Sequence, residues 1–376
     1  MFIRTIRKLA SILVLMLLTI HMTTAQASIL KVTWTQVLLG SIGAAGISPD
    51  GSLIVFRNKE TKQIAVIDWR TKQIVWSIPF DVGPTNTDFD TSIWSPNAKY
   101  IASLTLGNIY VFDATNGRNI TQIGSSLKAY DNLLRQLSNS DATGYSDLKW
   151  SADGKQLAVM IYGYILIYDL IKNDVVTIID LVNDQYSPSA RQYLSLFDWS
   201  QDGSKLVAFN YKRDNTPEKK ILYPFQVGVS VWDRNGQLLS KNDNPAADKD
   251  CRGDEFQGEA VPIGTDISWS SDNMTVAIAT NYAGYRVCSL QNDGSFIVHS
   301  LSDSVIQKIH WTSDQKWLIG NFNGGCSVMV SDVTKNYETH DEEVGGCGLW
   351  QWSQDDQYIV RGGENGLEVG KVELPT

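Results

Sequence analysis

Short apolar runs of strand length alternate with turn residues along most of this chain. The stretch 145–181 is typical, with runs at 145–150, 156–161, 164–169 and 174–181. These runs are rich in β-branched and aromatic residues and are bounded by Gly, Asp and Asn, as strands usually are. Asp153-Gly154 separates the first two runs, and glycine adopts the left-handed conformation that a tight hairpin turn requires. The pattern therefore predicts a four-stranded antiparallel sheet in each such stretch.

This unit recurs along the chain. Its first run ends in a short phrase: a tryptophan (isoleucine in the first copy), a serine or threonine, any residue, and then Asp or Asn. The phrases start at Ile47, Trp94, Trp150, Trp199, Trp269, Trp311 and Trp352. Successive starts lie 47, 56, 49, 70, 42 and 41 residues apart, and a period of about 40 to 50 residues is typical of propellers and other repeat arrays. We interpret the tryptophans as packing residues at the seams between stacked sheets.

The third run of five units ends in aspartate, at Asp68, Asp113, Asp169, Asp233 and Asp332. With this ending and the turn phrase, the sequence resembles the WD40 family. It is more closely similar to the bacterial, TolB-type WD40-like repeats with a Trp-Ser-Pro-Asp-Gly turn. The resemblance covers essentially all of residues 28–376, although Gly-His is absent and Trp-Asp occurs once, at Trp232-Asp233. The hydrogen-bonded tetrad of standard WD40 repeats should therefore be missing from most blades. The resemblance implies a β-propeller fold and protein partners.

The two ends of the repeat region complement each other. After Trp352 the chain has room for only two more runs, 357–362 and 367–372, whereas 30–39 is a strand-like run without a unit of its own. In WD40-like propellers the N-terminal strand completes the last blade. We therefore predict an all-β fold, a single seven-bladed propeller over residues 28–376, closed by 30–39 as the outer strand of the last blade. Closure removes the open sheet edges that promote aggregation.

The first 27 residues have the anatomy of a secretory signal peptide. Three basic residues are followed by the apolar stretch Leu9–Ile20 and the small-x-small sequence Ala25-Gln26-Ala27. An uncleaved membrane anchor is the alternative, but this stretch falls short of the roughly 20 apolar residues that span a bilayer. We expect cleavage after Ala27 and a secreted or periplasmic protein. In a eukaryotic secretory pathway, Asn119 and Asn273 would be glycosylation sites.

Charge narrows the range of partners. The signal carries three of the 32 basic residues and none of the 41 acidic ones, which leaves residues 28–376 with a net charge of −12. This balance disfavours nucleic acid as a partner, because nucleic-acid binding relies on basic surface. No second apolar run is long enough to cross a membrane. We expect a monomeric protein that binds protein partners.

Four cysteines follow the signal: Cys251, Cys288, Cys326 and Cys347. An even number in an exported protein favours disulfides. Metal binding is the alternative, but the sequence has no Cys-x-x-Cys pair and no nearby histidine cluster. Three pairings are possible, and we predict 251–288 and 326–347. Each of these pairs joins an interblade connection to the start of a neighbouring third strand on one rim, within plausible disulfide reach.

The surplus sequence falls on one rim of the predicted ring. It comprises residues 125–147, 183–193, 211–223 and 241–265, which join consecutive blades or the second and third strands of one blade. Connections of this length are usually functional or disordered, so we predict a partner-binding surface around blades three to five. Tyrosine and arginine are enriched at binding hot spots; the alternative is that these tyrosines brace their own loops. The candidate contacts are Tyr186, Tyr193, Tyr211, Arg213, Tyr223, Tyr282 and Tyr285.

Residues 248–259 resemble a calcium-binding loop of the EF-hand type. Acids stand at its positions one, three, seven and twelve, and a glycine stands at position six. However, Arg252 replaces an oxygen ligand at position five, and no helices flank the segment. We therefore interpret it as an acidic solvated loop, with Ca²⁺ as the alternative and no other cofactor expected. The metal ligands would be Asp248, Asp250, Asp254 and Glu259.

Catalytic motifs are absent from the sequence. It contains no Gly-x-Ser-x-Gly elbow, no His-Glu-x-x-His, no phosphate-binding loop and no dinucleotide fingerprint. Only His299, His310 and His340 follow the signal, and none has an obvious nucleophile or metal ligand beside it. We expect a binding protein rather than an enzyme. The alternative is a lactonase-like or quinoprotein-like propeller enzyme, or a ligand binder, with a metal in its central channel.

Overall fold

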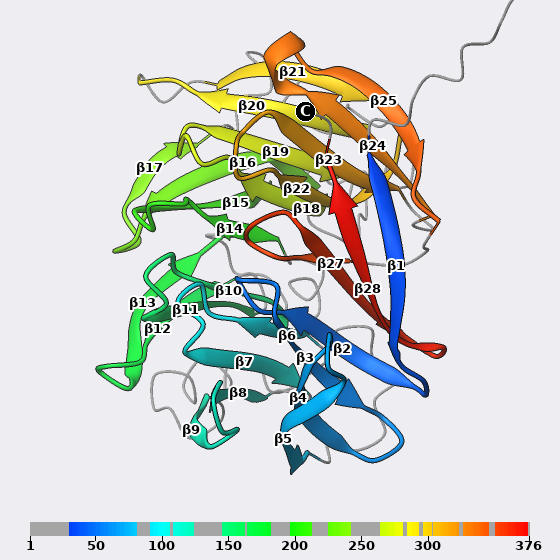
Figure 1. Ribbon diagram of the computed structural model, residues 1–376. Helices are drawn as coiled ribbons and strands as arrows, with labels where there is room; N and C mark the ends of the chain where they lie inside the picture. Colours follow the sequence, from blue (N-terminus) through cyan, green and yellow to red (C-terminus); the bar gives the residue numbers. More distant parts are fainter. Residues whose placement is uncertain are drawn as a thin grey trace, which may run out of the picture.

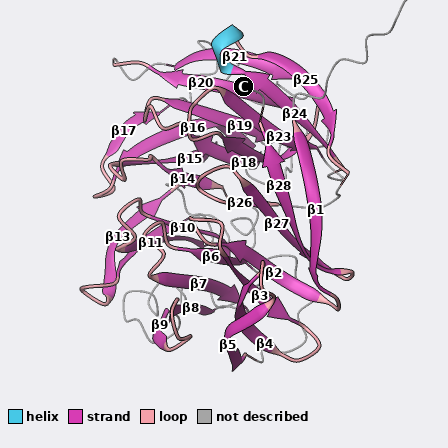
Figure 2. Cartoon of the chain, viewed as in Figure 1, coloured by secondary structure: helices cyan, strands magenta, loops and turns pink. Residues whose placement is uncertain are grey.

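The computed structural model describes most of the chain after residue 29. The described residues are 30–80, 91–105, 108–123, 145–161, 164–181, 196–212, 225–241, 264–280, 284–292, 296–302, 304–322, 326–345 and 350–374. Most of them lie in β-strands, and the one helix among them is the short 3-10 helix η1, Val333–Lys335 (Figure 2). No helix in this part of the chain has both the length and the apolar character needed to span a membrane.

The strands form seven four-stranded antiparallel sheets, the blades of a β-propeller (Figure 1). Blade 1 comprises β2 (Ile42–Ile47), β3 (Leu53–Asn58), β4 (Gln63–Asp68) and β5 (Gln73–Pro79). Blade 2 comprises β6 (Thr91–Trp94), β7 (Tyr100–Thr105), β8 (Asn108–Asp113) and β9 (Asn119–Ile123). Blade 3 comprises β10 (Tyr145–Trp150), β11 (Gln156–Ile161), β12 (Tyr164–Asp169) and β13 (Asp174–Asp180).

The other four blades follow the same order along the chain. Blade 4 comprises β14 (Phe197–Trp199), β15 (Lys205–Lys212), β16 (Phe225–Asp233) and β17 (Leu238–Lys241). Blade 5 comprises β18 (Gly264–Trp269), β19 (Thr275–Thr280), β20 (Gly284–Leu290) and β21 (Phe296–Ser302). Blade 6 comprises β22 (Ile306–Trp311), β23 (Trp317–Phe322), β24 (Ser327–Asp332) and β25 (Glu338–Glu343). Blade 7 comprises β26 (Gln351–Trp352), β27 (Tyr358–Gly363), β28 (Gly366–Glu373) and β1 (Lys31–Leu38).

The N-terminal strand closes the ring, as the sequence predicts. β1 pairs antiparallel with β28, from Lys31 opposite Glu373 to Leu38 opposite Leu367. In Figure 1 the first and last strands of the chain run side by side. Leu30 and Val37 are buried, so β1 contributes apolar packing as well as backbone hydrogen bonds. The seven blades and their closure are therefore confirmed.

The serine or threonine of the repeated phrase holds the turn between the first two strands of each blade. In blade 4 the hydroxyl of Ser200 donates to Asp202 Oδ1 at 2.6 Å and accepts the backbone N–H of Lys205 at 2.9 Å. Ser200 is 1% exposed. The same hydroxyl-to-Asp or hydroxyl-to-Asn bond recurs in the other six blades, from Ser48, Ser95, Ser151, Ser270, Thr312 and Ser353.

The glycine of this turn matters less than the sequence suggests. Gly51, Gly154 and Gly203 have a positive φ at the turn position, as expected. The other four blades hold Ala98, Asn273, Gln315 and Asp356 there, with φ between 56° and 61°. Left-handed backbone costs a non-glycine residue of the order of 1 kcal/mol. The buried hydroxyl and its carboxylate or amide partner are common to all seven turns and thus fix the conformation.

The buried motif tryptophans pack at the seams between blades, which confirms the packing role predicted for them. Trp94, Trp150 and Trp311 also donate their indole N–H to a carbonyl oxygen on the first strand of the preceding blade, at 3.1 to 3.4 Å. In the first copy, Ile47 packs instead against Val360 and other residues of blade 7. Each phrase therefore joins its blade to the previous one.

The aspartate at the end of the third strand caps the following turn. Asp169 Oδ1 accepts the backbone N–H groups of Ile171 and Lys172, both at 3.0 Å. These hydrogen bonds stabilise the charged form, and the one from Lys172 makes the largest contribution to the lowered pKa of Asp169. Asp332 makes the equivalent contacts at the start of η1. The recurrent aspartate is thus a turn residue.

Two of the four cysteines lie within the described residues. Cys288 is fully buried in β20, Cys326 precedes β24, and both are disulfide-bonded. Cys251 and Cys347 lie outside the described residues, so the 251–288 and 326–347 pairings stay a prediction. The signal peptide and its cleavage after Ala27 also lie outside these residues.

Candidate functional site: the central channel

The first strands of the blades surround a central cavity of about 980 Å³, to which all seven blades contribute residues. We call one end the turn rim, where each blade's first strand turns into its second; Pro49, Pro96 and Gln201 lie there. We call the other end the loop rim, where blades are connected and second strands join third strands; Gly43 and Glu364 lie there. The cavity therefore reaches from one rim to the other.

Alternation along each first strand selects which side chains approach the channel. The motif tryptophan and the residue two positions before it face the preceding blade and the core. Residues one and three positions before the tryptophan face the following blade and the channel. In blades 3 to 6 these positions are mostly charged, and they are occupied by Asp147, Lys149, Asp198, Asp266, Lys308 and His310. In blades 1 and 2 they hold Ala44, Gly46, Thr91 and Ile93.

Two of the carboxylates hydrogen-bond to the channel edge of the neighbouring blade. Each first strand pairs on one side only, so its other edge presents unpaired backbone groups to the channel. Asp198 Oδ2 accepts the backbone N–H of Trp269 at 2.9 Å. Asp266 Oδ2 accepts that of Ile309 at 2.8 Å. These two aspartates therefore join blades 4 to 5 and 5 to 6.

The two lysines make longer contacts. Lys149 Nζ lies 3.9 Å from Asp198 Oδ1, and Lys308 Nζ lies 3.6 Å from Asp266 Oδ1. Both distances exceed that of a hydrogen bond. The lysine side chains are 31% and 41% exposed, whereas those of Asp198 and Asp266 are 18% and 6% exposed. The ammonium groups thus reach into the channel, and the carboxylates are held in its wall.

Burial and mutual attraction shift the pKa values of this cluster. Burial raises the pKa of Asp198 to about 6, although nearby Lys149 opposes the shift. Burial also raises the pKa of Asp147, against the attraction of Lys149 and Lys308. Burial alone would lower the pKa of Lys149, but Asp147, Asp198 and Asp266 outweigh it and the pKa is raised. Lys149 therefore carries its charge throughout the physiological pH range.

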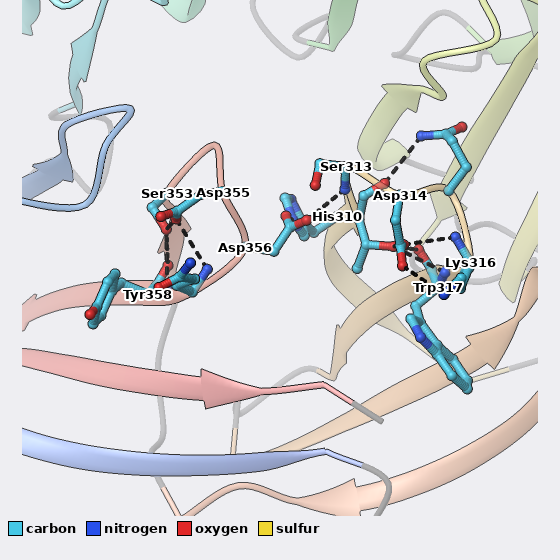
Figure 3. A network of polar contacts seen from close by, with 12 residues as sticks. His310, Ser313, Asp314, Lys316, Trp317, Ser353, Asp355, Asp356 and Tyr358 are labelled. Carbon is cyan, nitrogen blue, oxygen red and sulfur yellow. Dashed lines mark hydrogen bonds and ion pairs between the residues drawn. The ribbon is translucent and has the colours of Figure 1, made fainter. Parts of the chain in front are cut away.

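A second polar network joins blades 6 and 7 at the turn rim (Figure 3). His310 Nε2 lies 2.6 Å from Asp356 Oδ1, and Asp356 Oδ2 accepts the backbone N–H of Ser313 at 2.6 Å. The imidazole also stacks on Trp352, with ring centroids 4.3 Å apart and planes 4° apart. One face of the His310 ring and its Nε2 thus connect blade 6 to blade 7. The other two histidines lie elsewhere, His299 against Tyr337 and His340 beside Glu338.

The sequence-predicted contact residues are mostly outside this description. Tyr186, Tyr193, Arg213, Tyr223 and Tyr282 lie outside the described residues, as do the calcium-loop residues Asp248, Asp250, Asp254 and Glu259. Tyr211 belongs to β15, and its side chain is not described. Among the described residues, no group of three or more His, Cys, Asp or Glu side chains is placed to hold a metal ion.

Tyr285 requires a correction. We predicted it as a partner contact, but its side chain is fully buried in the core cluster between blades 5 and 6. Alternation along β20 turns Tyr285, Val287 and Ser289 to one face of the sheet, and this burial raises the pKa of the Tyr285 phenol well above its usual value. The sequence reasoning also missed the channel charges. Aligning the seven phrases on their first residue would have found these charges, because charged residues recur one and three positions before that residue.

Comparison with known proteins supports the fold alone. No protein-family model matches this chain, and no curated protein matches it either. Among solved structures, the chain is similar to the crystal structure of the Myceliophteria thermophila Cps50 (Swd1) β-propeller domain, with a TM-score of 0.62. The similarity covers 92% of this chain and 100% of that domain, at 10% sequence identity. At this identity the comparison shows the β-propeller fold alone.

Proposed function

We propose that this protein is an exported, WD40-like propeller of the TolB type that acts as an interaction platform for a protein partner. The propeller fold is consistent with such a role. The proposal adds three points to the fold: export through the N-terminal signal, binding through the loop rim of blades 3 to 5, and a binding rather than catalytic role.

One observation carries the proposal: the long connections all depart from strand ends on the same rim. Residues 124–144, 182–195 and 242–263 join the fourth strand of one blade to the first strand of the next. Residues 213–224 join the second strand of blade 4 to its third. Because the strands of a blade alternate in direction, both kinds of connection leave from the loop rim. The turn rim of the same blades carries short hairpin turns.

This asymmetry favours selection for binding over tolerated insertion. Insertions that were merely tolerated would be expected on both rims, because surface loops at either end are thermodynamically permissive. Binding residues are disproportionately carried by loops on a rigid scaffold. The connections of blades 3 to 5 also contain tyrosines and Arg213, the residue types enriched at energetic hot spots of interfaces.

The proposal is tested by comparing what three forms of residues 28–376 capture from the native extract. The first is unchanged, and the second carries a Gly-Ser linker in place of residues 213–223, outside the paired part of β15. The third carries Gln201→Arg and Gln354→Arg, two exposed residues on the turn rim. We expect the unchanged protein and the turn-rim variant to enrich the same partner and the linker variant to lose it. Equal capture of the partner by all three forms would refute binding at blade 4. Loss of the partner in the turn-rim variant alone would show binding at the turn rim, contrary to the proposal.

A further inference from the structure

The seam between blades 6 and 7 contains polar groups that no neighbour satisfies. The side-chain amide of Asn321, on β23, is 4% exposed, and neither its nitrogen nor its oxygen has a hydrogen-bond partner among the described residues. In the same part of the chain, the indole N–H of Trp350, which precedes β26, also lacks a partner, and Trp350 is 6% exposed. Buried polar groups in proteins are nearly always hydrogen-bonded. Trp317 in the same seam also has an unpartnered indole N–H, so these unsatisfied side chains call for a missing partner.

Asn321 and Trp350 belong to the lining of the central cavity, as does Lys308. Lys308 stands directly opposite Asn321 in the pairing of β22 with β23, so their side chains leave the same face of the sheet. Trp350 packs against Trp317 and Ile319, which share the strand of Asn321. We call this trio the seam corner: Lys308, Asn321 and Trp350.

The seam corner offers mainly hydrogen-bond donors. An ammonium group and an indole N–H donate only, and an amide donates through its nitrogen. Within the described residues, Lys308 Nζ has no hydrogen bond, and its nearest carboxylate oxygen is 3.6 Å away on Asp266. The other oxygen of Asp266 already accepts the N–H of Ile309. One oxygen of Asp266 is thus bonded to the backbone and the other is ion-paired with Lys308, whereas the amide of Asn321 and the indole N–H of Trp350 have no partner within the described residues.

We propose that the seam corner binds a carboxylate group. A carboxylate has two oxygens with about four acceptor sites, which suits a site whose lining carries donors on three residues from two blades. Its charge complements the Lys308 ammonium, and hydrogen bonds to charged groups are the stronger ones. The ligand is either a small free carboxylic acid or an acidic side chain of a partner that enters from the loop rim. This site is independent of the proposed binding through the long connections.

The indole N–H of Trp350 provides a direct readout. Its ¹H–¹⁵N resonance is assigned by comparison with a Trp350→Phe variant and followed at constant ionic strength, with chloride replaced stepwise by acetate. Acetamide, the neutral counterpart of similar shape, is titrated in parallel. We expect a saturable shift with acetate and a much smaller one with acetamide. A site with a Kd in the millimolar range would be largely occupied at about 50 mM acetate. Absence of a shift at that concentration, or an equal response to acetamide, would overturn the proposal.

Variants separate the corner from a general effect of charge. Lys308→Met should weaken acetate binding by about tenfold or more, the loss expected for one charge-assisted hydrogen bond. Lys316→Met, an exposed lysine on the turn rim that lines no part of the cavity, is the matched control and should leave binding unchanged. Equal loss in both lysine variants would contradict a specific site.

A second variant keeps the test decisive if Lys308→Met does not fold. Asn321→Leu should abolish the acetate response and raise the melting temperature, because it removes an unsatisfied buried amide. Retained acetate binding in Asn321→Leu would overturn the proposal. A capped peptide, acetyl-Gly-Glu-Gly-amide, then identifies the source of the carboxylate. Binding of this peptide comparable to acetate points to a partner's side chain, and binding of acetate alone points to a small acid.

Discussion

Replacing Ser200 with alanine tests the idea that a buried hydroxyl holds each turn of the propeller. The Ser200 hydroxyl makes two short hydrogen bonds that alanine cannot make, beside a longer contact with the Lys205 carbonyl oxygen at 3.2 Å. It donates to Asp202 Oδ1 at 2.6 Å and accepts the backbone N–H of Lys205 at 2.9 Å. Ser204, two residues after Asp202, has a more exposed hydroxyl that donates a hydrogen bond to the same carboxylate oxygen at 2.8 Å. Ser204→Ala is therefore a matched control.

The two substitutions should differ clearly in cost. Ser200→Ala removes one hydrogen bond to a charged group, typically about 1.5 to 3 kcal/mol, and one neutral bond of about 1 kcal/mol. A loss of about 2 to 4 kcal/mol in the free energy of unfolding follows. Ser204→Ala removes an exposed bond that water replaces, so its cost should stay near 0.5 kcal/mol. For a chain of this size, each kcal/mol corresponds to roughly 2 °C in melting temperature.

Unfolding by urea, followed by tryptophan fluorescence for both variants and the parent, measures this difference at pH 7. The pH dependence adds a second check. Asp202 has a lowered pKa in the folded protein, where burial raises it but hydrogen bonds from Ser200 and Ser204 lower it more. Stability from such a carboxylate is present above its unfolded pKa and is lost as the pH falls through its folded pKa. The cost of Ser200→Ala should therefore shrink below about pH 4. A cost for Ser200→Ala no larger than that for Ser204→Ala would refute the role of the buried hydroxyl.

Three further predictions concern the channel, the closure and the turns. Asp198→Asn removes a carboxyl whose pKa is raised from 3.8 to about 6 by burial; the parent should lose stability relative to the variant as the pH rises from about 4 to 6, by at most about 3 kcal/mol, and parallel curves in urea titrations would contradict this. Deleting residues 28–39 exposes the edge of β28 and should cause aggregation visible by light scattering; a soluble monomer would count against the closure. Ala98→Gly relieves the strain of a φ of 57° and should raise the free energy of unfolding by about 0.5 to 1 kcal/mol. A neutral or destabilising effect in calorimetry would contradict this.

The sequence predicts the fold well because the same local pattern recurs in seven repeats. The motif tryptophans, the turn phrase and the unpaired run 30–39 all point to one closed ring. What the pattern could not predict depends on where neighbouring blades meet. The charges at Asp266 and Lys308 look like single polar interruptions in apolar strands until adjacent first strands are placed around one channel. Asn321 and Trp350 likewise gain meaning only from the seam, because nothing in their own strands marks their side chains as unsatisfied.

Tyr285 illustrates the opposite error. Its position beside a connection suggested exposure, but strand alternation directs its ring into the seam between blades 5 and 6. Tyrosine as a residue type suggested a partner contact, but the position of Tyr285 in the alternation along β20 determines that its side chain is buried. By contrast, the glycine noted in the turn at Asp153-Gly154 is not needed in every blade, because the hydroxyl bond to a carboxylate or amide oxygen is also present in the turns that hold Ala98, Gln315 and Asp356.

Binding of a protein partner at the loop rim is measured by hydrogen–deuterium exchange of the propeller alone and with its captured partner. Protection on binding should concentrate in peptides covering residues 182–195, 213–224 and 242–263, and in the adjoining ends of β13, β15 and β17. The turn-rim peptides that contain Ser151, Ser200 and Ser270 should exchange at unchanged rates. Protection confined to those turns, or to the outer strands of the blades, would contradict binding at the loop rim.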